Sequence, residues 1–115
     1  TYGHQFGNTV LTGFADIIKE NIRHVDVAFR YGGEEFVILF PFVISNKAAI
    51  AVKKIRAQQA QKNFVTDEGK TVNITVSAGV ATYLTKECAN SFIKRADKAM
   101  YQAKENGKNQ VVIAK

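Results

Sequence analysis

The sequence predicts one mixed α/β domain, in which helices pack against an antiparallel or mixed β-sheet. The main reason is that segments with apolar residues at helical spacing alternate along the chain with short segments rich in β-branched residues. The length of 115 residues is close to the most common domain size. A hydrophobic fraction of 46% and a charged fraction of 23%, with one proline, are typical of a packed domain rather than a disordered chain.

The first expected element is a helix from about Thr9 to Arg23. Its apolar side chains recur at helical spacing and form one stripe, and Asn8 just before it is expected to cap the helix. Residues 26–30 and 34–40 then predict two strands, because the glycines between them allow the positive φ angles of a hairpin turn. The second of these strands is apolar on both faces and should be covered on both sides.

The middle of the chain predicts a second helix and a further strand. Ser45 is expected to cap a helix that runs to about Ala60, and residues 62–70 are expected to form an exposed turn. Residues 72–81 alternate between β-branched and polar side chains, which predicts a strand with one face toward the core.

The end of the chain predicts a third helix from about residue 90 to residue 105. Its apolar side chains again recur at helical spacing, and Gly107 is expected to end it in a left-handed conformation. Residues 111–113 predict a last short strand.

Charge and cysteine content limit the partners and the compartment. The formal charge of +6 favours a polyanionic partner, and nucleotide phosphates, nucleic acid and anionic lipid all fit. The basic residues are spread along the chain, so simple solubility explains the charge equally well. No apolar run reaches the roughly 18 residues that span a bilayer, and the single cysteine, Cys88, predicts a reduced thiol in a cytosolic protein.

Two glycines and two acids stand together at the predicted hairpin, namely Gly32, Gly33, Glu34 and Glu35. Neighbouring side chains of a strand point to opposite faces, so the two carboxylates cannot serve one site in the same way. The glycines leave room for a ligand against the backbone, and an acid at the tip can hold a cation such as Mg²⁺ that neutralises phosphate. The simpler interpretation is a glycine turn followed by two solvated acids, but the apolar strand after the acids favours a metal site.

The segment Arg30-Tyr31-Gly32-Gly33-Glu34-Glu35-Phe36 resembles the signature of GGDEF-domain diguanylate cyclases, in its GGEEF form. Residues 3–7 resemble the family's loop before its first core helix, residues 73–81 its VTVSIGVA strand, and residues 94–109 its last long helix. These matches stand in the family's order and cover nearly the whole chain. The resemblance implies a palm-like, ferredoxin-related sheet of mostly antiparallel strands flanked by helices, as in nucleotide cyclases.

The resemblance also implies an activity. In the family a homodimer joins two GTP molecules into cyclic di-GMP and releases pyrophosphate, with Mg²⁺ or Mn²⁺ as cofactor. By the same resemblance Glu34 is a catalytic acid and the metal ligand, and Glu35 is the adjacent catalytic acid of the signature. Gly32 and Gly33 are then substrate-binding residues that let the nucleotide approach the backbone.

Three more residues correspond to substrate contacts of the family. Lys104 and Lys108 match basic residues that touch the terminal phosphates, although both also suit the C-terminal end of a helix. Asn8 stands where the family usually has an aspartate that reads guanine. An amide offers only part of what a carboxylate accepts, so the resemblance implies a softer selectivity for GTP.

Arg23 and Asp26 form an RxxD segment before the signature. In the family this spacing forms an inhibitory site for the product, in which an arginine fork suits phosphate and guanine edges. The cooperating arginine of the family falls at Lys54, which contacts phosphate as a point charge, so product inhibition is expected to be weakened. The simpler interpretation is an arginine that ends a helix and an aspartate that starts a strand.

The family's first core strand, which ends in a metal-binding aspartate, is expected upstream of Thr1, so residues 1–115 should form a GGDEF domain without this strand. We therefore expect the 115-residue polypeptide alone to be inactive and unstable unless something fills that position. An N-terminal sensor domain is expected in a longer parent protein. The expected location is cytoplasmic, without nucleic-acid or membrane contact by this domain, while membrane anchoring of the parent stays open.

Two other functions stay open on the sequence. A catalytically silent GGDEF module that binds cyclic di-GMP and regulates a partner would also keep Arg23 and Asp26. A basic, sheet-based RNA binder would need exposed aromatic residues for stacking, whereas Phe36 and Phe40 are expected to be buried.

Overall fold

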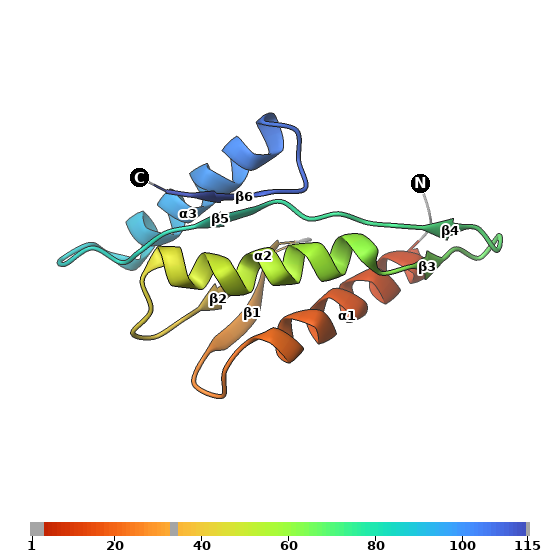
Figure 1. The fold of residues 1–115 in the computed structure, drawn as a ribbon, viewed down its shortest axis with the longest axis horizontal. Helices are drawn as coiled ribbons and strands as arrows, with labels where there is room; N and C mark the ends of the chain where they lie inside the picture. Colours follow the sequence, from red (N-terminus) through yellow and green to blue (C-terminus); the bar gives the residue numbers. More distant parts are fainter. Residues whose placement is uncertain (1–3, 33–34, 115) are drawn as a thin grey trace.

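A computed structural model describes residues 4–32 and 35–114 of the chain (Figure 1). Its elements are, in order, α1 (His4–Asn21), β1 (Val27–Gly32), β2 (Glu35–Leu39), α2 (Ser45–Gln61), β3 (Phe64–Val65), β4 (Thr71–Val72), β5 (Ala78–Val80), α3 (Ala89–Glu105) and β6 (Val111–Ile113). The pairs β1–β2 and β3–β4 are antiparallel, and β5–β6 is parallel. The predicted mixed fold of helices and mostly antiparallel strands is confirmed.

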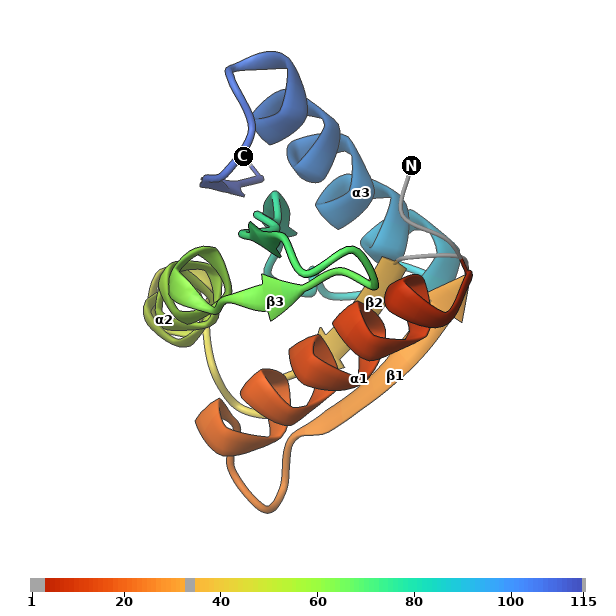
Figure 2. The ribbon, with the colours of Figure 1, turned by 90° about the vertical axis from the view of Figure 1, so that its right-hand side faces the viewer.

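The helices lie on different sides of the strands. In Figure 1, β5 and β6 lie between α2 and α3, which both contact them. The hairpin β1–β2 packs its inner face on α1 through Phe36 and Ile38, beside the buried side chains of Ile17, Ile18 and Ile55. Figure 2, turned by 90°, shows the three helices spaced around the segment that leads from β4 to β5.

A large cleft runs between the hairpin and the segment before β5. It has a volume of about 1640 Å³, and side chains from α1, β2, residues 74–82 and α3 line it. We call it the central cleft. Apolar side chains form much of its lining, among them Phe14, Ile18, Phe36, Ile38, Ile74 and Val76.

The first helix begins earlier than predicted, at His4, so the prediction that Asn8 caps it is wrong. Phe6 explains the difference, because its side chain is 6% exposed and its ring meets that of Phe64 edge-on at a centroid distance of 6.4 Å. Burial of Phe6 extends the apolar stripe of the helix by one turn toward the N-terminus. Asn8 is therefore an exposed residue inside α1.

The predicted cap of the second helix is also wrong. Ser45 is the first residue of α2, and Ile44 stands at the cap position without a side-chain hydrogen bond. The backbone N–H of Ser45 instead donates to Oγ1 of Thr82 at 2.8 Å. A hydroxyl from a loop distant in the sequence thus satisfies a free donor at this helix end.

The strand predicted for residues 72–81 is interrupted. In this region β4 pairs with β3, and β5 pairs with β6. Residues 73–77 between them belong to no strand pair within the described ranges. The turn predicted for residues 62–70 contains β3, in which Phe64 is buried. A strand forms hydrogen bonds only where a neighbouring strand lies beside it. Residues 74–77 lie beside the central cleft and have no such neighbour among the described residues.

The strand β2 is less covered than predicted. Phe36 and Phe40 are half-buried, and Leu39 is 40% exposed, so the expectation of cover on both faces is wrong. On the neighbouring strand, Phe29 and Tyr31 are exposed. The central cleft accounts for the openness, because β2 forms one of its walls.

Candidate functional site

Gly32 and Glu35, the described residues of the glycine and acid segment, lie at the end of the β1–β2 hairpin, as predicted. Gly32 at the end of β1 pairs with Glu35 at the start of β2. A Cβ placed on Gly32 would have no atom within 4 Å, so a ligand can approach the backbone here. Gly33 and Glu34 lie outside the described residues, and what the sequence predicts for these two residues stays a prediction.

The structure brings Glu35 and Lys104 to the same cleft. Glu35 is half-buried at the start of β2, and Lys104 is exposed in the last turn of α3, yet both line the central cleft. The Lys104 ammonium also lies 5.4 Å from the ring centroid of Tyr101. Asp97 and Ser77 add polar groups to the lining. A cation beside an open, partly apolar space suits an anionic ligand with an apolar body, such as a nucleotide.

Lys108 lies just beyond α3, in the turn that leads to β6. It is exposed and has a φ of 64°, which is unusual for a residue with a side chain. Its backbone N–H donates to the carbonyl oxygen of Ala103 at 2.9 Å, in the manner of a helix C-cap. Lys104 and Lys108 thus share one end of α3, as the sequence predicted, although only Lys104 lines the central cleft.

Asn8 belongs to a different hollow. It lines a shallow groove of about 640 Å³ between α1 and the β3 region, together with Thr12, Asp16, Lys62 and Asn63. The structure therefore does not place Asn8 in the cleft that Glu35 and Lys104 line. Its predicted role as a guanine contact stays a prediction.

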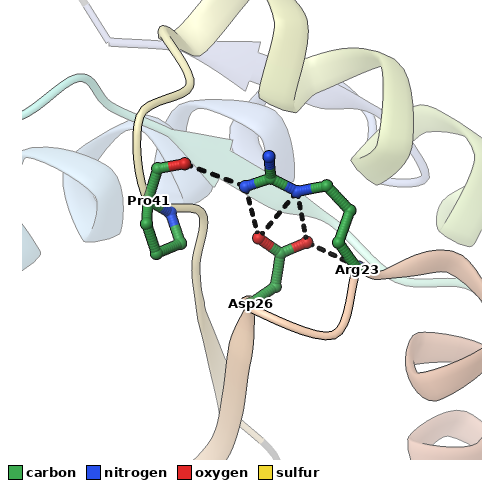
Figure 3. Close-up of polar contacts among 3 residues, drawn as sticks. All are labelled: Arg23, Asp26 and Pro41. Atoms are coloured by element: carbon green, nitrogen blue, oxygen red, sulfur yellow. Dashed lines mark hydrogen bonds and ion pairs between the residues drawn. The ribbon is translucent and has the colours of Figure 1, made fainter.

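Arg23 and Asp26 form a closed pair at the junction of α1 and β1 (Figure 3). The guanidinium donates to both carboxylate oxygens, with the shortest contact from Nη2 to Oδ1 at 2.6 Å. The backbone N–H of Arg23 donates to Oδ2 at 2.6 Å, and Nη2 also donates to the carbonyl oxygen of Pro41 at 2.9 Å. The side chain of Asp26 is 1% exposed and that of Arg23 is 50% exposed.

These contacts fix the charge state of Asp26. The hydrogen bonds from the Arg23 side chain, helped by its backbone N–H and its positive charge, lower the pKa of the Asp26 carboxyl. Asp26 is therefore ionised at neutral pH and already engaged by Arg23. A ligand that used Asp26 as an acceptor would have to displace part of this pairing, whereas the exposed half of Arg23 is open to a ligand directly.

Lys54 lies on α2, close in the fold to the end of α1. The Asn21 amide donates to Oε1 of Gln58 at 2.8 Å, and Gln58 is one turn beyond Lys54. Lys54 itself is exposed, and no hydrogen bond or ion pair joins it to Arg23 or Asp26 among the described residues. The three predicted residues of the inhibitory site are thus on adjacent elements without forming one contact network.

Two side-chain pairs between separate segments of the fold were not predicted from the sequence. Arg95 of α3 forms an ion pair with Glu87 at 2.7 Å, and its hydrogen bonds lower the pKa of the Glu87 carboxyl. Arg56 of α2 donates to Oδ1 of Asn109 at 2.9 Å. No local pattern marks these pairs, because their partners come from separate elements.

The described residues also bear on metal binding. They contain no group of three or more His, Cys, Asp or Glu side chains that could hold a metal ion. Mg²⁺ commonly binds through one or two carboxylates together with substrate phosphates and water, so a site of few protein ligands fits this ion. None of the helices in the described part of the chain is long and apolar enough to cross a membrane.

Comparison with known proteins gives one family. A protein-family model described as "Diguanylate cyclase, GGDEF domain" matches residues 1–110. The chain is 42% identical over 116 aligned positions to the protein named diguanylate cyclase A of Treponema denticola, covering 100% of this chain and 31% of that protein. The chain therefore spans less than a third of this relative's length.

Solved structures give the same family. The coiled coil and GGDEF domain of DgcB from Caulobacter crescentus, in complex with c-di-GMP, superposes with a TM-score of 0.93 at 32% identity. That match covers 99% of this chain and 61% of the other. An active GGEEF domain of a diguanylate cyclase from Vibrio cholerae superposes with a TM-score of 0.86 at 28% identity, covering 98% of this chain and 71% of the other. These neighbours confirm the predicted palm-like fold.

Proposed function

This chain belongs to the GGDEF domain family, and on that premise we propose that it is a diguanylate cyclase domain of bacterial second-messenger signalling. Two GTP molecules are condensed into cyclic di-GMP, and pyrophosphate is released. The observation that carries the proposal is the convergence of Glu35, from the GGEEF hairpin, and Lys104, from the end of α3, on the central cleft. A nucleotide triphosphate in that cleft would meet a cation and the open backbone at Gly32.

Lys104 and Lys108 bind the terminal phosphates in this proposal. Both stand at the C-terminal end of α3, and both are exposed. Charge-assisted hydrogen bonds from an ammonium to phosphate oxygens are stronger than neutral ones, and they neutralise charge that would repel the attacking oxygen. The formal net charge of +6 would also attract GTP, which is a polyanion.

The proposed cofactor is Mg²⁺ or Mn²⁺, with Glu34 as its ligand from the hairpin tip. The bound ion would supply charge stabilisation at the reacting phosphate. Glu34 provides a hard carboxylate oxygen of the kind such ions prefer, and phosphate oxygens can complete the ligand set. Glu35, the other acid of the signature, lines the cleft beside the proposed nucleotide. We propose that it is the second catalytic acid.

The condensation needs two nucleotides held in line, so we propose that the active form is a homodimer. Each subunit holds one GTP, and the 3′-hydroxyl of each attacks the α-phosphate of the other. Holding both reactants in a fixed geometry removes much of the entropic barrier of a reaction between two molecules. An N-terminal sensor domain in a longer protein would control this pairing, and a supply of GTP makes the cytoplasm the proposed location.

We further propose that the apolar part of the central cleft accepts the family's first core strand, which carries a second metal-binding carboxylate, while the nucleotide occupies the part lined by Glu35 and Lys104. The apolar lining from Phe36, Ile38, Ile74 and Val76 suits a buried strand, and the backbone groups of residues 73–77 belong to no strand pair in the part of the chain that the structure describes. Expressing residues 1–115 alone tests this proposal. The polypeptide should unfold with low cooperativity and turn over no GTP, and a stable, active product would contradict it.

The cyclase proposal itself is tested with the full-length protein. Incubation with GTP and Mg²⁺ should yield cyclic di-GMP and pyrophosphate, measured by chromatography, and EDTA should abolish the product. Glu34→Gln should reduce the rate by at least about 100-fold if the carboxylate is the metal ligand, while Glu68→Gln, in an exposed turn, serves as the matched control. Absence of cyclic di-GMP from a folded full-length protein would refute the proposal.

A second function is favoured by the presence of the RxxD residues Arg23 and Asp26 and by the exposed half of the Arg23 side chain. A silent module that binds cyclic di-GMP and regulates a partner would need this pair and no intact metal site. The same incubation separates the two, since the silent module would bind cyclic di-GMP but form none.

A further inference from the structure

The turn between α3 and β6 has an unusual backbone. Gly107, Lys108 and Asn109 have φ angles of 120°, 64° and 52°, so these consecutive residues all lie in the left-handed region. Glycine adopts this region freely and asparagine tolerates it, but lysine does so rarely. Lys108 is therefore held in a conformation that its own side chain disfavours, and the hold must come from its surroundings.

Some of the hydrogen bonds that fix this backbone conformation are local. The backbone N–H of Lys108 donates to the carbonyl oxygen of Ala103, and the side-chain amide of Gln110 donates to the carbonyl oxygens of Asn106 and Lys108 at 3.1 and 3.2 Å. These bonds close the end of α3. They do not tie the turn to any other element of the fold.

Three residues of other segments also contact the turn. The backbone N–H of Ala78, at the start of β5, donates to the carbonyl oxygen of Gln110 at 3.0 Å, and the other two residues act on Asn109. Arg56 of α2 donates from Nη1 to Oδ1 of Asn109 at 2.9 Å. Ser77, in the segment before β5, accepts the backbone N–H of Asn109 at its Oγ at 3.2 Å. The side chain of Asn109 is thus hydrogen-bonded to α2, and its backbone N–H is hydrogen-bonded to the segment before β5.

We propose that Arg56 and Ser77 are positioning residues that, through Asn109, hold the turn so that Lys108 presents its ammonium to the nucleotide phosphates. The inference rests on the proposed function, in which Lys104 and Lys108 bind those phosphates. A lysine side chain is long and has many rotamers, so a fixed backbone is what restricts the space its ammonium can reach. The contacts tie this backbone to Ser77, a residue that lines the central cleft.

The test uses the full-length protein and compares Arg56→Ala, Lys108→Ala and the double variant. The readouts are the equilibrium affinity for a non-hydrolysable GTP analogue and the KM and kcat for GTP. Lys53→Ala is the matched control, because it removes one positive charge from the exposed face of the same helix. Thermal unfolding of each variant separates loss of positioning from loss of fold.

Arg56→Ala should weaken analogue binding by about 3- to 10-fold, as expected for loss of a single hydrogen bond that orders a charged ligand group. It should raise KM more than it lowers kcat. In the Lys108→Ala background the same change should have no further effect, because the effect passes through Lys108. Ser77→Ala should behave like Arg56→Ala, and Ser77→Thr, which keeps the hydroxyl, should restore binding.

Two results would overturn the inference, and they are distinguishable from failure of the proposed function. If Arg56→Ala weakens binding equally with and without Lys108, or matches Lys53→Ala, Arg56 does not act through Lys108. If Lys108→Ala binds the analogue as the wild type does, Lys108 does not contact phosphate and the positioning role falls with it. A protein that binds no GTP at all would instead refute the proposed function together with everything that rests on it.

Discussion

Gly79 of β5 lies directly against the backbone of Ala96 in α3. A Cβ on Gly79 would overlap the carbonyl oxygen of Ala96, and the backbone nitrogen of Met100 lies almost as near. Helix and strand therefore touch backbone to backbone, which only glycine permits. This contact sets how close α3, with Lys104 at its end, approaches the segment that lines the central cleft.

Gly79→Ala should therefore destabilise the fold by about 3 kcal/mol or more, since backbone atoms of a helix cannot move aside as a flexible side chain can. Urea unfolding of the full-length protein measures the change. Gly7→Ala is the matched control, because a Cβ there meets no atom within 4 Å on the exposed face of α1. That variant should be neutral or stabilised by up to about 1 kcal/mol. Equal stability of both variants would contradict the close contact.

Asp26→Asn should destabilise the fold by about 1 to 3 kcal/mol at pH 7, because Arg23 loses a charged acceptor. The pKa of Asp26 is lowered in the folded state, so its contribution is complete above the ordinary aspartate pKa and is lost as pH falls through the folded-state value. The gap between wild type and variant should thus shrink below about pH 4. Urea unfolding at several pH values measures it.

The control for this titration is Asp67→Asn, in an exposed turn. Its effect should stay within about 0.5 kcal/mol at every pH. A gap between the wild type and Asp26→Asn that stays constant or widens toward low pH would show that the Arg23 pairing does not stabilise the ionised carboxyl.

Lys104→Ala should weaken binding of GTP by about tenfold, the loss expected for one charge-assisted hydrogen bond. The ammonium is exposed, so the wild-type advantage should fall as salt is added. Lys98→Ala removes the same charge from an exposed position of α3 and should leave binding within about twofold. Calorimetry with a non-hydrolysable analogue gives the affinities. If both variants lose affinity alike, the net charge rather than the site accounts for binding.

Lys54→Arg should tighten binding of cyclic di-GMP by about 3- to 10-fold, because a guanidinium fork can bind phosphate or a guanine edge at two points. Equilibrium dialysis of the full-length protein measures the affinity. Lys53→Arg, on the next residue of α2, makes the same chemical change and should have no effect. Arg23→Ala should weaken the binding, and unchanged affinity in all of these variants would place the product site elsewhere.

Local sequence patterns predicted most elements of the fold. The apolar spacing in α2 and α3 marked both helices within a residue or two, and the glycines marked the hairpin between β1 and β2. The errors lie where a distant residue decides. Phe6 extends α1 because it packs on Phe64, and Thr82 accepts the N–H of Ser45 at the start of α2.

The site divides in the same way. Arg23 contacts Asp26 over only three positions along the chain. The product-binding role that the family resemblance gives these two residues stays a prediction. The openness of β2 was not predicted from its apolar residues, because burial depends on which elements lie on either side of a strand. Only the family resemblance led us to expect an unfilled position in the sheet. The predictions for Gly33 and Glu34 stand as the sequence made them.

The sequence by itself determined the helices and hairpin, the family signature and the residue types that chemistry on phosphates requires. These follow from side chains a few positions apart, whose spacing is a property of the local backbone. Tertiary structure alone decided that Glu35 and Lys104 line one cleft. It also decided that Arg56 and Ser77 form hydrogen bonds with Asn109. Such pairs join elements far apart in the chain, and no local spacing encodes which elements the packing of the core brings together.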